Sequence, residues 1–152
     1  MRQRTPLVMH IEDDDDHAEL VAAAMAASKL GCRIIRFSDA ESGLEYLSSV
    51  RHSVKRDDHP LPDLVLLDLV LPGMSGLEFL RHLRMNIGTK GIPVVALSTS
   101  DRDVEIAEAY QHGINSYIVK PVVVDDLIVR LAEMNMYWFE TAEVPCLETA
   151  AF

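Results

Sequence analysis

The chain has 152 residues, of which 49% are hydrophobic and 25% charged, with two cysteines and a formal net charge of −10. This length favours one domain, two cysteines are too few for a disulfide framework, and the acidic balance argues against binding nucleic-acid phosphates. No apolar run approaches the ~20 residues of a membrane span and the start lacks the apolar core of a signal peptide, so we expect a cytoplasmic protein without a membrane partner.

Apolar residues over 5–11 predict a first strand, in which His10 is expected to be a hydrogen-bonded strand residue rather than a metal ligand. Acidic residues follow, and an alanine-rich helix is expected over 17–29, with Asp15 or Asp16 as its N-cap.

Residues 32–37 predict a second strand, and residues 39–49 a second helix. The segment 51–62 is charged and ends in Pro-Leu-Pro. We interpret it either as a surface loop or as an extension of the second helix followed by a loop.

The third strand lies in the stretch 63–72, whose apolar run is interrupted by a single carboxylate, Asp68. Such runs are typical of parallel strands that are covered on both faces. A charge in the middle of a buried strand is costly, whereas the C-terminal tip of a strand in an open α/β sheet is where ligands bind. Because Pro72 and Gly73 end the strand, we expect Asp68 at the mouth of a crevice.

The remaining pattern continues the alternation of helices and strands. It predicts a helix over 76–86, a strand over 92–97, a helix from a cap at Ser100 or Asp101 to about His112, a strand over 116–119, and a long helix from Val122 to about Phe139.

Five strand–helix repeats predict an α/β fold with helices on both faces of a parallel sheet. Right-handed crossovers favour the flavodoxin-like doubly wound (βα)5 arrangement, with the five strands in the order 2-1-3-4-5. Residues 1–139 then form the domain, and residues 140–152 form a C-terminal extension.

In this order the first and third strands are neighbours, so Glu12 and Asp13 stand beside Asp68. Three acidic groups in one crevice repel one another unless a cation is present, and oxygen ligands suit Mg²⁺. The backbone carbonyl of Val70 is a further candidate oxygen.

Ser98 and Lys120, at the ends of the fourth and fifth strands, are expected at the same crevice. A hydroxyl and an ammonium group suit the sides of a phosphoryl group that the metal leaves uncovered. Asp68 is then a carboxylate nucleophile that forms an aspartyl phosphate.

With these residues at the strand ends, the chain resembles a two-component response-regulator receiver domain. The matching segments are Ile-Glu-Asp at 11–13, Leu-Leu-Asp at 66–68 with Pro72 and Gly76, Pro-Val-Val-Ala-Leu-Ser at 93–98, and Tyr-Ile-Val-Lys-Pro at 117–121. The resemblance implies a phosphoacceptor signalling protein rather than an enzyme, which receives a phosphoryl group on Asp68 from a sensor histidine kinase. It implies that Mg²⁺ is held by Glu12, Asp13, Asp68 and the Val70 carbonyl. It also implies that Lys120 binds the phosphoryl oxygen and that Ser98 and Tyr117 form the switch pair.

Details of the loops and of the aromatic run 137–139 resemble the single-domain regulators that pair with phytochrome-type histidine kinases. Output must then pass to another protein, such as a downstream partner or a histidine phosphotransferase. Val70 is apolar where relatives carry a polar side chain that helps to orient water, and we therefore expect slow self-dephosphorylation.

The last helix and the tail carry more apolar residues than one side of a helix can bury. This excess favours a two-fold homodimer in which the fifth helix and the 140–152 arm contact the partner subunit. The alternative is a tail that folds back on its own domain or is disordered.

Two other functions remain open. A Mg²⁺-dependent phosphatase with an aspartate nucleophile usually needs a second acid two residues after the nucleophile, and that position is Val70. The other is a receiver-like interaction module that is never phosphorylated, against which the presence of Asp68, Ser98 and Lys120 argues.

Overall fold

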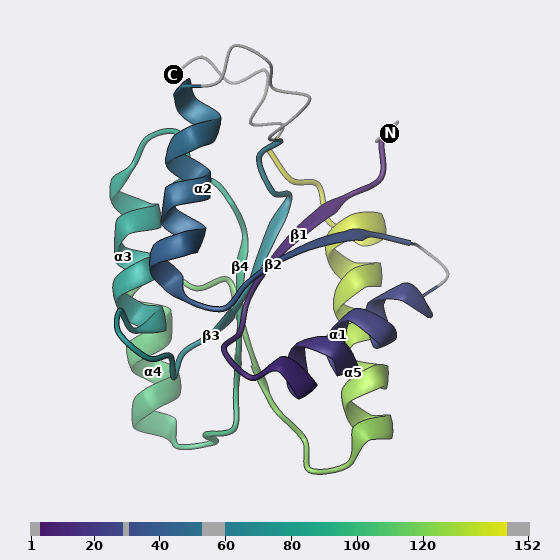
Figure 1. The fold of residues 1–152 in the computed structure, drawn as a ribbon. Coiled ribbons are helices and arrows are strands. Elements are labelled where there is room, and N and C mark those ends of the chain that lie inside the picture. Colours follow the sequence, from purple (N-terminus) through teal and green to yellow (C-terminus); the bar gives the residue numbers. More distant parts are fainter. Residues whose placement is uncertain (1–3, 29–30, 53–59, 146–152) are drawn as a thin grey trace.

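The computed structural model describes residues 4–28, 31–52 and 60–145. Five parallel strands form one sheet in the order β2-β1-β3-β4-β5 (Figure 1), which confirms the predicted flavodoxin-like fold. The strands are β1 (Leu7–Ile11), β2 (Arg33–Phe37), β3 (Leu64–Asp68), β4 (Val94–Ser98) and β5 (Ser116–Val119).

The three central strands are buried along their whole length, whereas the edge strands β2 and β5 are mostly half-buried. This difference follows from position, because helices cover both faces of a central parallel strand. The register pairs Asp68 with Leu97 and Ser98 with Val119. The C-terminal ends of β3, β4 and β5 therefore lie at the same edge of the sheet.

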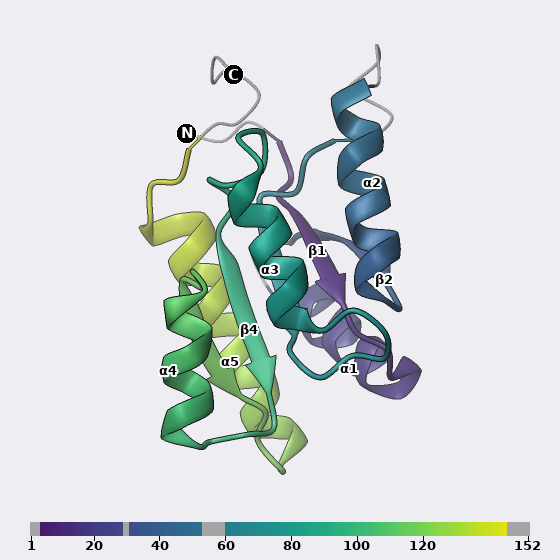
Figure 2. The same ribbon diagram turned by 90° about the vertical axis from the view of Figure 1, so that its left-hand side faces the viewer.

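The helices divide into two layers. They are α1 (Asp15–Ala26), α2 (Ala40–His52), α3 (Gly76–Met85), α4 (Asp103–Gln111) and α5 (Val124–Met136). Helices α2, α3 and α4 cover one face of the sheet, and α1 and α5 cover the other (Figures 1 and 2). Each face has its own core, built around Phe79 and Leu83 on the first and around Met25 and Leu131 on the second.

Two helix starts differ from the sequence prediction. Helix α1 begins two residues early, because Asp14 rather than Asp15 or Asp16 is the N-cap and accepts a hydrogen bond from the His17 backbone N–H at 3.0 Å. Helix α4 begins after Arg102, which makes no side-chain cap bond. Ser100, expected as the cap, instead accepts a hydrogen bond from the Arg102 N–H in the preceding turn.

The predicted continuous last helix is also wrong, because α5 ends at Met136 and a π-helical turn over Tyr137–Thr141 follows. The Ala142 N–H donates to the Tyr137 carbonyl at 2.7 Å, five residues back. This wider turn packs Trp138 and Phe139 against the core under α5 and leaves Tyr137 exposed.

The segment expected over 51–62 falls partly on α2, which extends to His52, and its residues 53–59 lie outside the described part of the chain. The tail from Cys146 onward also lies outside it, so the arm predicted over 140–152 is described only up to Pro145. Among the described residues, no helix has both the length and the apolar character needed to cross a membrane.

Candidate functional site

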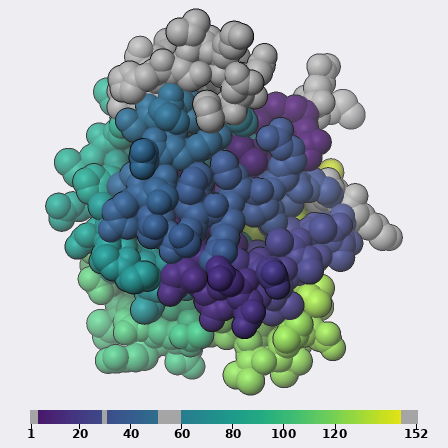
Figure 3. All heavy atoms as spheres, viewed as in Figure 1, coloured from purple at the N-terminus to yellow at the C-terminus, as the bar shows by residue number. Residues whose placement is uncertain are grey.

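Three carboxylates from two neighbouring strands meet at the C-terminal edge of the sheet. Glu12 follows β1, Asp13 comes next, and Asp68 is the last residue of β3. One oxygen of each group lies within 4.8 Å of an oxygen of each other group. Glu12 and Asp68 are buried, at 1% and 7% exposure, while Asp13 is exposed at the surface. In Figure 3 the purple residues that follow β1 reach the surface in the lower part of the molecule.

The side chain of Lys120, the residue that follows β5, contacts two of these carboxylates. Its Nζ donates to Asp68 Oδ2 at 3.2 Å and to the two Glu12 carboxylate oxygens at 3.3 and 3.4 Å. The Lys120 backbone N–H donates to the Ser98 carbonyl at 2.7 Å, which fixes the turn that aims the side chain. One ammonium group is thus shared between two buried carboxylates.

The site has three carboxylates but only the Lys120 ammonium group to offset their negative charge, among the described residues. Burial raises the pKa of the Glu12 carboxyl well above its usual range, and the neighbouring Asp68 raises it further, while Lys120 acts in the opposite direction. Oxygen donors that crowd together in this way are the ligands that a hard divalent cation prefers. The donor set fits Mg²⁺, which would relieve the repulsion among these acids.

The loop after β3 wraps around the Asp68 side chain. The Val70 backbone N–H donates to Asp68 Oδ1 at 3.0 Å, while the Val70 side chain is 75% exposed. Gly76, the first residue of α3, packs so closely that a Cβ there would lie 2.5 Å from the Asp68 carbonyl oxygen. A side chain at position 76 would therefore push the start of α3 away from the site.

Ser98 and Tyr117 are linked through Ser100, which the sequence indicated only as a candidate helix cap. Ser98, buried at the end of β4, accepts a hydrogen bond through Oγ from the Ser100 backbone N–H at 3.2 Å. The carbonyl of Ser100 in turn accepts a hydrogen bond from the Tyr117 hydroxyl at 2.8 Å. Both predicted switch residues therefore hold the same turn, one at its N–H and the other at its C=O.

Two further polar residues missed by the sequence reasoning support the loops. Arg36 in β2 donates to the Glu12 carbonyl and to Asp15, and Glu41 in α2 accepts a hydrogen bond from the Met74 backbone N–H. The only sequence signal for Arg36 is a charged residue between apolar neighbours in a strand. Glu41 gave no signal, because acidic residues near a helix start are common.

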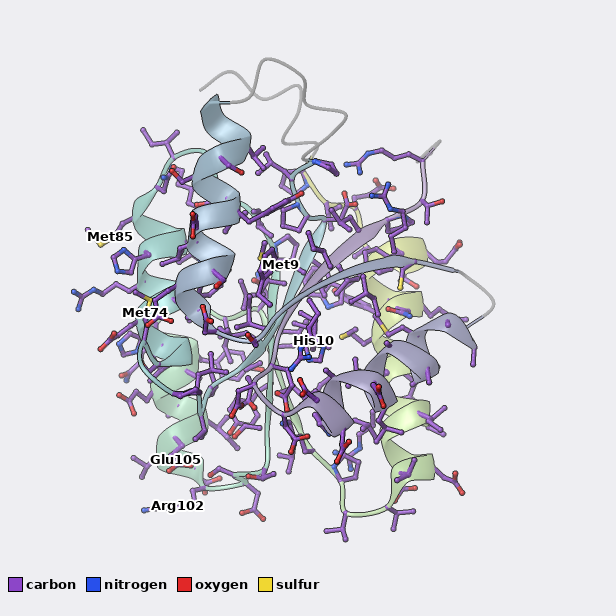
Figure 4. The ribbon with its side chains drawn as sticks, in the orientation of Figure 1. Met9, His10, Met74, Met85, Arg102 and Glu105 are labelled. Atoms are coloured by element: carbon purple, nitrogen blue, oxygen red, sulfur yellow. The ribbon has the colours of Figure 1, made fainter. Side chains whose placement is uncertain are left out.

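His10 was predicted to be hydrogen-bonded, and this is wrong for its Nε2 atom. The side chain is buried on the α1 side of the sheet (Figure 4), and Nε2 has no partner among the described residues. Burial, and to a smaller extent the nearby His17, lowers the pKa of His10 to about 3. The imidazole is therefore neutral at physiological pH.

Comparison with known proteins identifies relatives of this arrangement. A family model for the response regulator receiver domain matches residues 8–132. The response regulator Rcp1 of Synechocystis sp. is 29% identical to the chain over 139 residues, which cover 91% of this chain and 92% of Rcp1. The crystal structure of the Mn²⁺-bound form of Rcp1 aligns with a TM-score of 0.80 at 27% identity, over 93% of this chain and 99% of that one.

Two other solved structures are similar over most of the chain. The phosphorylated cyanobacterial phytochrome response regulator RcpA is 29% identical with a TM-score of 0.81, over 93% of this chain and 99% of that one. Response regulator RPA3017, from red light signalling of R. palustris, is 33% identical with a TM-score of 0.84, over 92% and 98% of the two chains.

Proposed function

The chain belongs to the response regulator receiver domain family, and we propose that it is a single-domain response regulator that accepts a phosphoryl group on Asp68 from a sensor histidine kinase. The observation that supports this most is the pairing of Asp68 with Lys120 at a strand end that also carries Glu12 and Asp13. Phosphoryl transfer to a carboxylate requires a nucleophile with an ammonium group and cation ligands beside it, and this site has all three.

In the proposed reaction, a carboxylate oxygen of Asp68 attacks the phosphorus of the kinase phosphohistidine. The P–N bond breaks, its electron pair passes to the imidazole nitrogen, and an acyl phosphate forms on Asp68. The Val70 N–H holds Oδ1 and the Lys120 ammonium holds Oδ2, so the carboxylate cannot rotate freely. Little covalent chemistry is left to the protein beyond positioning and charge stabilisation.

Glu12, Asp13 and Asp68, with the Val70 carbonyl, are the proposed ligands of Mg²⁺. When bound, the cation supplies positive charge that offsets the developing charge on the phosphoryl oxygens. Lys120 supplies the second positive charge, and in the phosphorylated protein it pairs with a phosphoryl oxygen. Ser98, at the end of the neighbouring strand, donates its hydroxyl to the same group.

We propose that the signal leaves the site through Ser98 and Tyr117. If the Ser98 hydroxyl turns toward the phosphoryl group, Oγ no longer accepts from Ser100, and the turn that Tyr117 holds is free to rearrange. Tyr117 then moves inward behind β4. A coupling of about 1–3 kcal/mol is enough to change partner affinity 5- to 150-fold.

The relatives suggest the partners. RcpA is a phytochrome response regulator and RPA3017 belongs to red light signalling, so we propose a phytochrome-type histidine kinase as donor and a downstream protein or histidine phosphotransferase as receiver. The kinase domain and this chain would meet in the cytoplasm. The net charge of −10 makes direct nucleic-acid binding unfavourable.

We also propose a homodimer formed through α5. The outward face of this helix carries Val124, Ile128, Val129 and Met136, all at least 37% exposed, and Tyr137 continues it. Val124, Ile128 and Met136 recur at multiples of four residues, so they form an apolar stripe along several turns that Val129 and Tyr137 widen, which is typical of an interface. The domain then ends near Phe139, and the extension 140–152 would embrace the partner subunit.

Light scattering in solution tests the dimer. Ile128→Lys places a charge in the centre of the stripe and is expected to halve the mass. Glu133→Lys changes an exposed position on the same helix without touching an apolar residue, and should leave the mass unchanged. A monomeric wild-type protein would contradict the dimer but would leave phosphoryl transfer untouched.

One experiment separates the proposed function from the two alternatives. The protein is incubated with Mg²⁺ and acetyl phosphate, and both intact mass and released phosphate are followed. A response regulator gains a long-lived adduct of about 80 Da, the mass of one phosphoryl group. A phosphatase releases phosphate with continuous turnover and little adduct, and an interaction module gives neither.

A further inference from the structure

The Arg36 side chain reaches from the edge strand β2 to the loop that carries two of the proposed cation ligands. Its Nε and Nη2 donate to the Glu12 carbonyl oxygen at 3.0 and 2.8 Å. Its Nη1 donates to Asp15 Oδ1 at 2.7 Å. One guanidinium group therefore contacts both the end of β1 and the first turn of α1.

The carbonyl that Arg36 contacts belongs to the peptide group that joins Glu12 to Asp13. The orientation of this peptide group sets ψ of Glu12 and φ of Asp13, and with them the directions of the two side chains relative to each other. The N–H of Glu12 is held as well, because it donates to the Phe37 carbonyl at 3.0 Å. Both backbone polar groups of Glu12 are thus fixed by β2, and the planar fork of Arg36 restricts rotation more than a single donor would.

The loop needs such a restraint because it is rich in like charges. Residues 13–16 are four consecutive aspartates, all exposed, and Glu12 lies buried beside Asp68. Repulsion among these carboxylates favours loop conformations in which Glu12 and Asp13 point apart. A restraint on the peptide group between them opposes that tendency.

We propose that Arg36 is a positioning residue for the cation site, which holds the Glu12–Asp13 peptide so that both carboxylates face Asp68. The inference rests on the proposed function, because it assumes that these carboxylates bind Mg²⁺. Arg36 itself is not a ligand, since it carries only donors.

Whether removal of Arg36 weakens or strengthens Mg²⁺ binding distinguishes a positioning role from a purely electrostatic one. If Arg36 acted only as a nearby positive charge, its removal would strengthen binding of a cation. If it positions the ligands, its removal weakens binding, as happens when groups that orient metal ligands are lost.

The test measures Mg²⁺ binding to the full chain by calorimetry at constant ionic strength. We expect Arg36→Met to weaken binding about tenfold, and Arg36→Lys, which keeps the charge and one donor, to lie between that variant and the wild type. Arg33→Met is the matched control, because Arg33 is an exposed arginine at the other end of β2, where it pairs with Leu7 at the start of β1. Its binding should equal that of the wild type.

A second pair of variants guards against misfolding of Arg36→Met. Asp15→Asn and Asp16→Asn each remove one exposed negative charge, but only Asp15 contacts Arg36 among the contacts described here. We expect the first to weaken Mg²⁺ binding more than the second. Unchanged or tighter binding in Arg36→Met, or equal effects of the two aspartate variants, would overturn the inference. Absence of binding in the wild type would instead refute the proposed cation site.

Discussion

Lys120 Nζ lies 3.2 Å from Asp68 Oδ2 and 3.3 Å from Glu12 Oε1, so one ammonium group serves two buried carboxylates from different strands. The same carboxylates are the proposed ligands of Mg²⁺. The lysine and the cation would therefore compete for the same negative charge in the unphosphorylated protein.

This competition predicts the behaviour of Lys120→Met. Without metal, the variant leaves Glu12 and Asp68 without their cation, and its free energy of unfolding should fall by about 3 kcal/mol. Its affinity for Mg²⁺ should rise about tenfold, because a competing positive charge is gone. Urea unfolding at a series of Mg²⁺ concentrations measures both quantities. Lys90→Met, at an exposed position after α3, is the control, and an identical response of the two variants would rule out the competition.

The exposed side chain of Val70 predicts a long-lived acyl phosphate. An amide at this position orients a water molecule toward the phosphorus, so Val70→Asn should shorten the phosphoryl lifetime several-fold. The decay of the phosphorylated mass after removal of the donor gives this rate. Val104→Asn on α4 has nearly the same exposure and side-chain change, and should decay like the wild type. Equal lifetimes for Val70→Asn and wild type would refute a role for residue 70.

The shared turn at Ser100 predicts that uptake and signalling can be separated. Ser98→Ala removes the oxygen that accepts from the Ser100 N–H, while the contacts of Asp68 with Val70 and Lys120 remain. Phosphorylation should continue, but the amide NMR shifts of β5 and α4 on phosphorylation should shrink. Tyr117→Phe should give the same result, because the bond to the Ser100 carbonyl is lost.

Ser116→Ala, in the same strand as Tyr117, provides the comparison and should respond like the wild type. Complete loss of phosphoryl uptake in Ser98→Ala would show that Ser98 belongs to the transfer step and not to the switch.

The buried His10 predicts sensitivity to acid. Burial is the main reason that its pKa falls from 6.5 to about 3. Below pH 6.5 the unfolded chain binds a proton that the folded protein does not, so stability falls as the pH drops toward 3, by up to about 1.4 kcal/mol per pH unit. The facing charged groups that lower the pKa are His17 of α1, Lys120 after β5 and Arg36 of β2, and Asp68 of β3 raises it.

His10→Leu should flatten this dependence, because leucine cannot bind a proton. The free energy of unfolding of both proteins is measured between pH 7 and 4. Its fall per pH unit should be smaller in His10→Leu than in the wild type, and this difference should be largest at the acidic end. Parallel curves would mean that His10 is not the group responsible.

The sequence predicted the fold well because its signals are local and repeated. Apolar runs of strand length alternate with helical patterns, and this alternation restricts the topology without knowledge of any contact. Asp68 could be identified because a carboxylate in an apolar run is costly unless it lies at the strand end.

Other features depend on contacts that no sequence pattern encodes. The cap of α1 moved to Asp14 because four neighbouring aspartates offer equivalent oxygens, and only the backbone geometry selects among them. The π-helical turn after Met136 places Trp138 and Phe139 on the core, a contact between segments far apart in the sequence. Arg36 binds the backbone carbonyl of Glu12, and the backbone of Ser100 binds the side chains of Ser98 and Tyr117, so only the folded chain reveals these roles.

The most direct test of the central claim is the intact mass of the protein after incubation with acetyl phosphate, compared between the wild type and Asp68→Asn. We predict that the wild type gains one group of about 80 Da in Mg²⁺ and none after chelation, and that Asp68→Asn gains none under either condition. An adduct of equal yield on Asp68→Asn, or no adduct on the wild type in saturating Mg²⁺, would contradict the assignment of Asp68 as the phosphoryl acceptor.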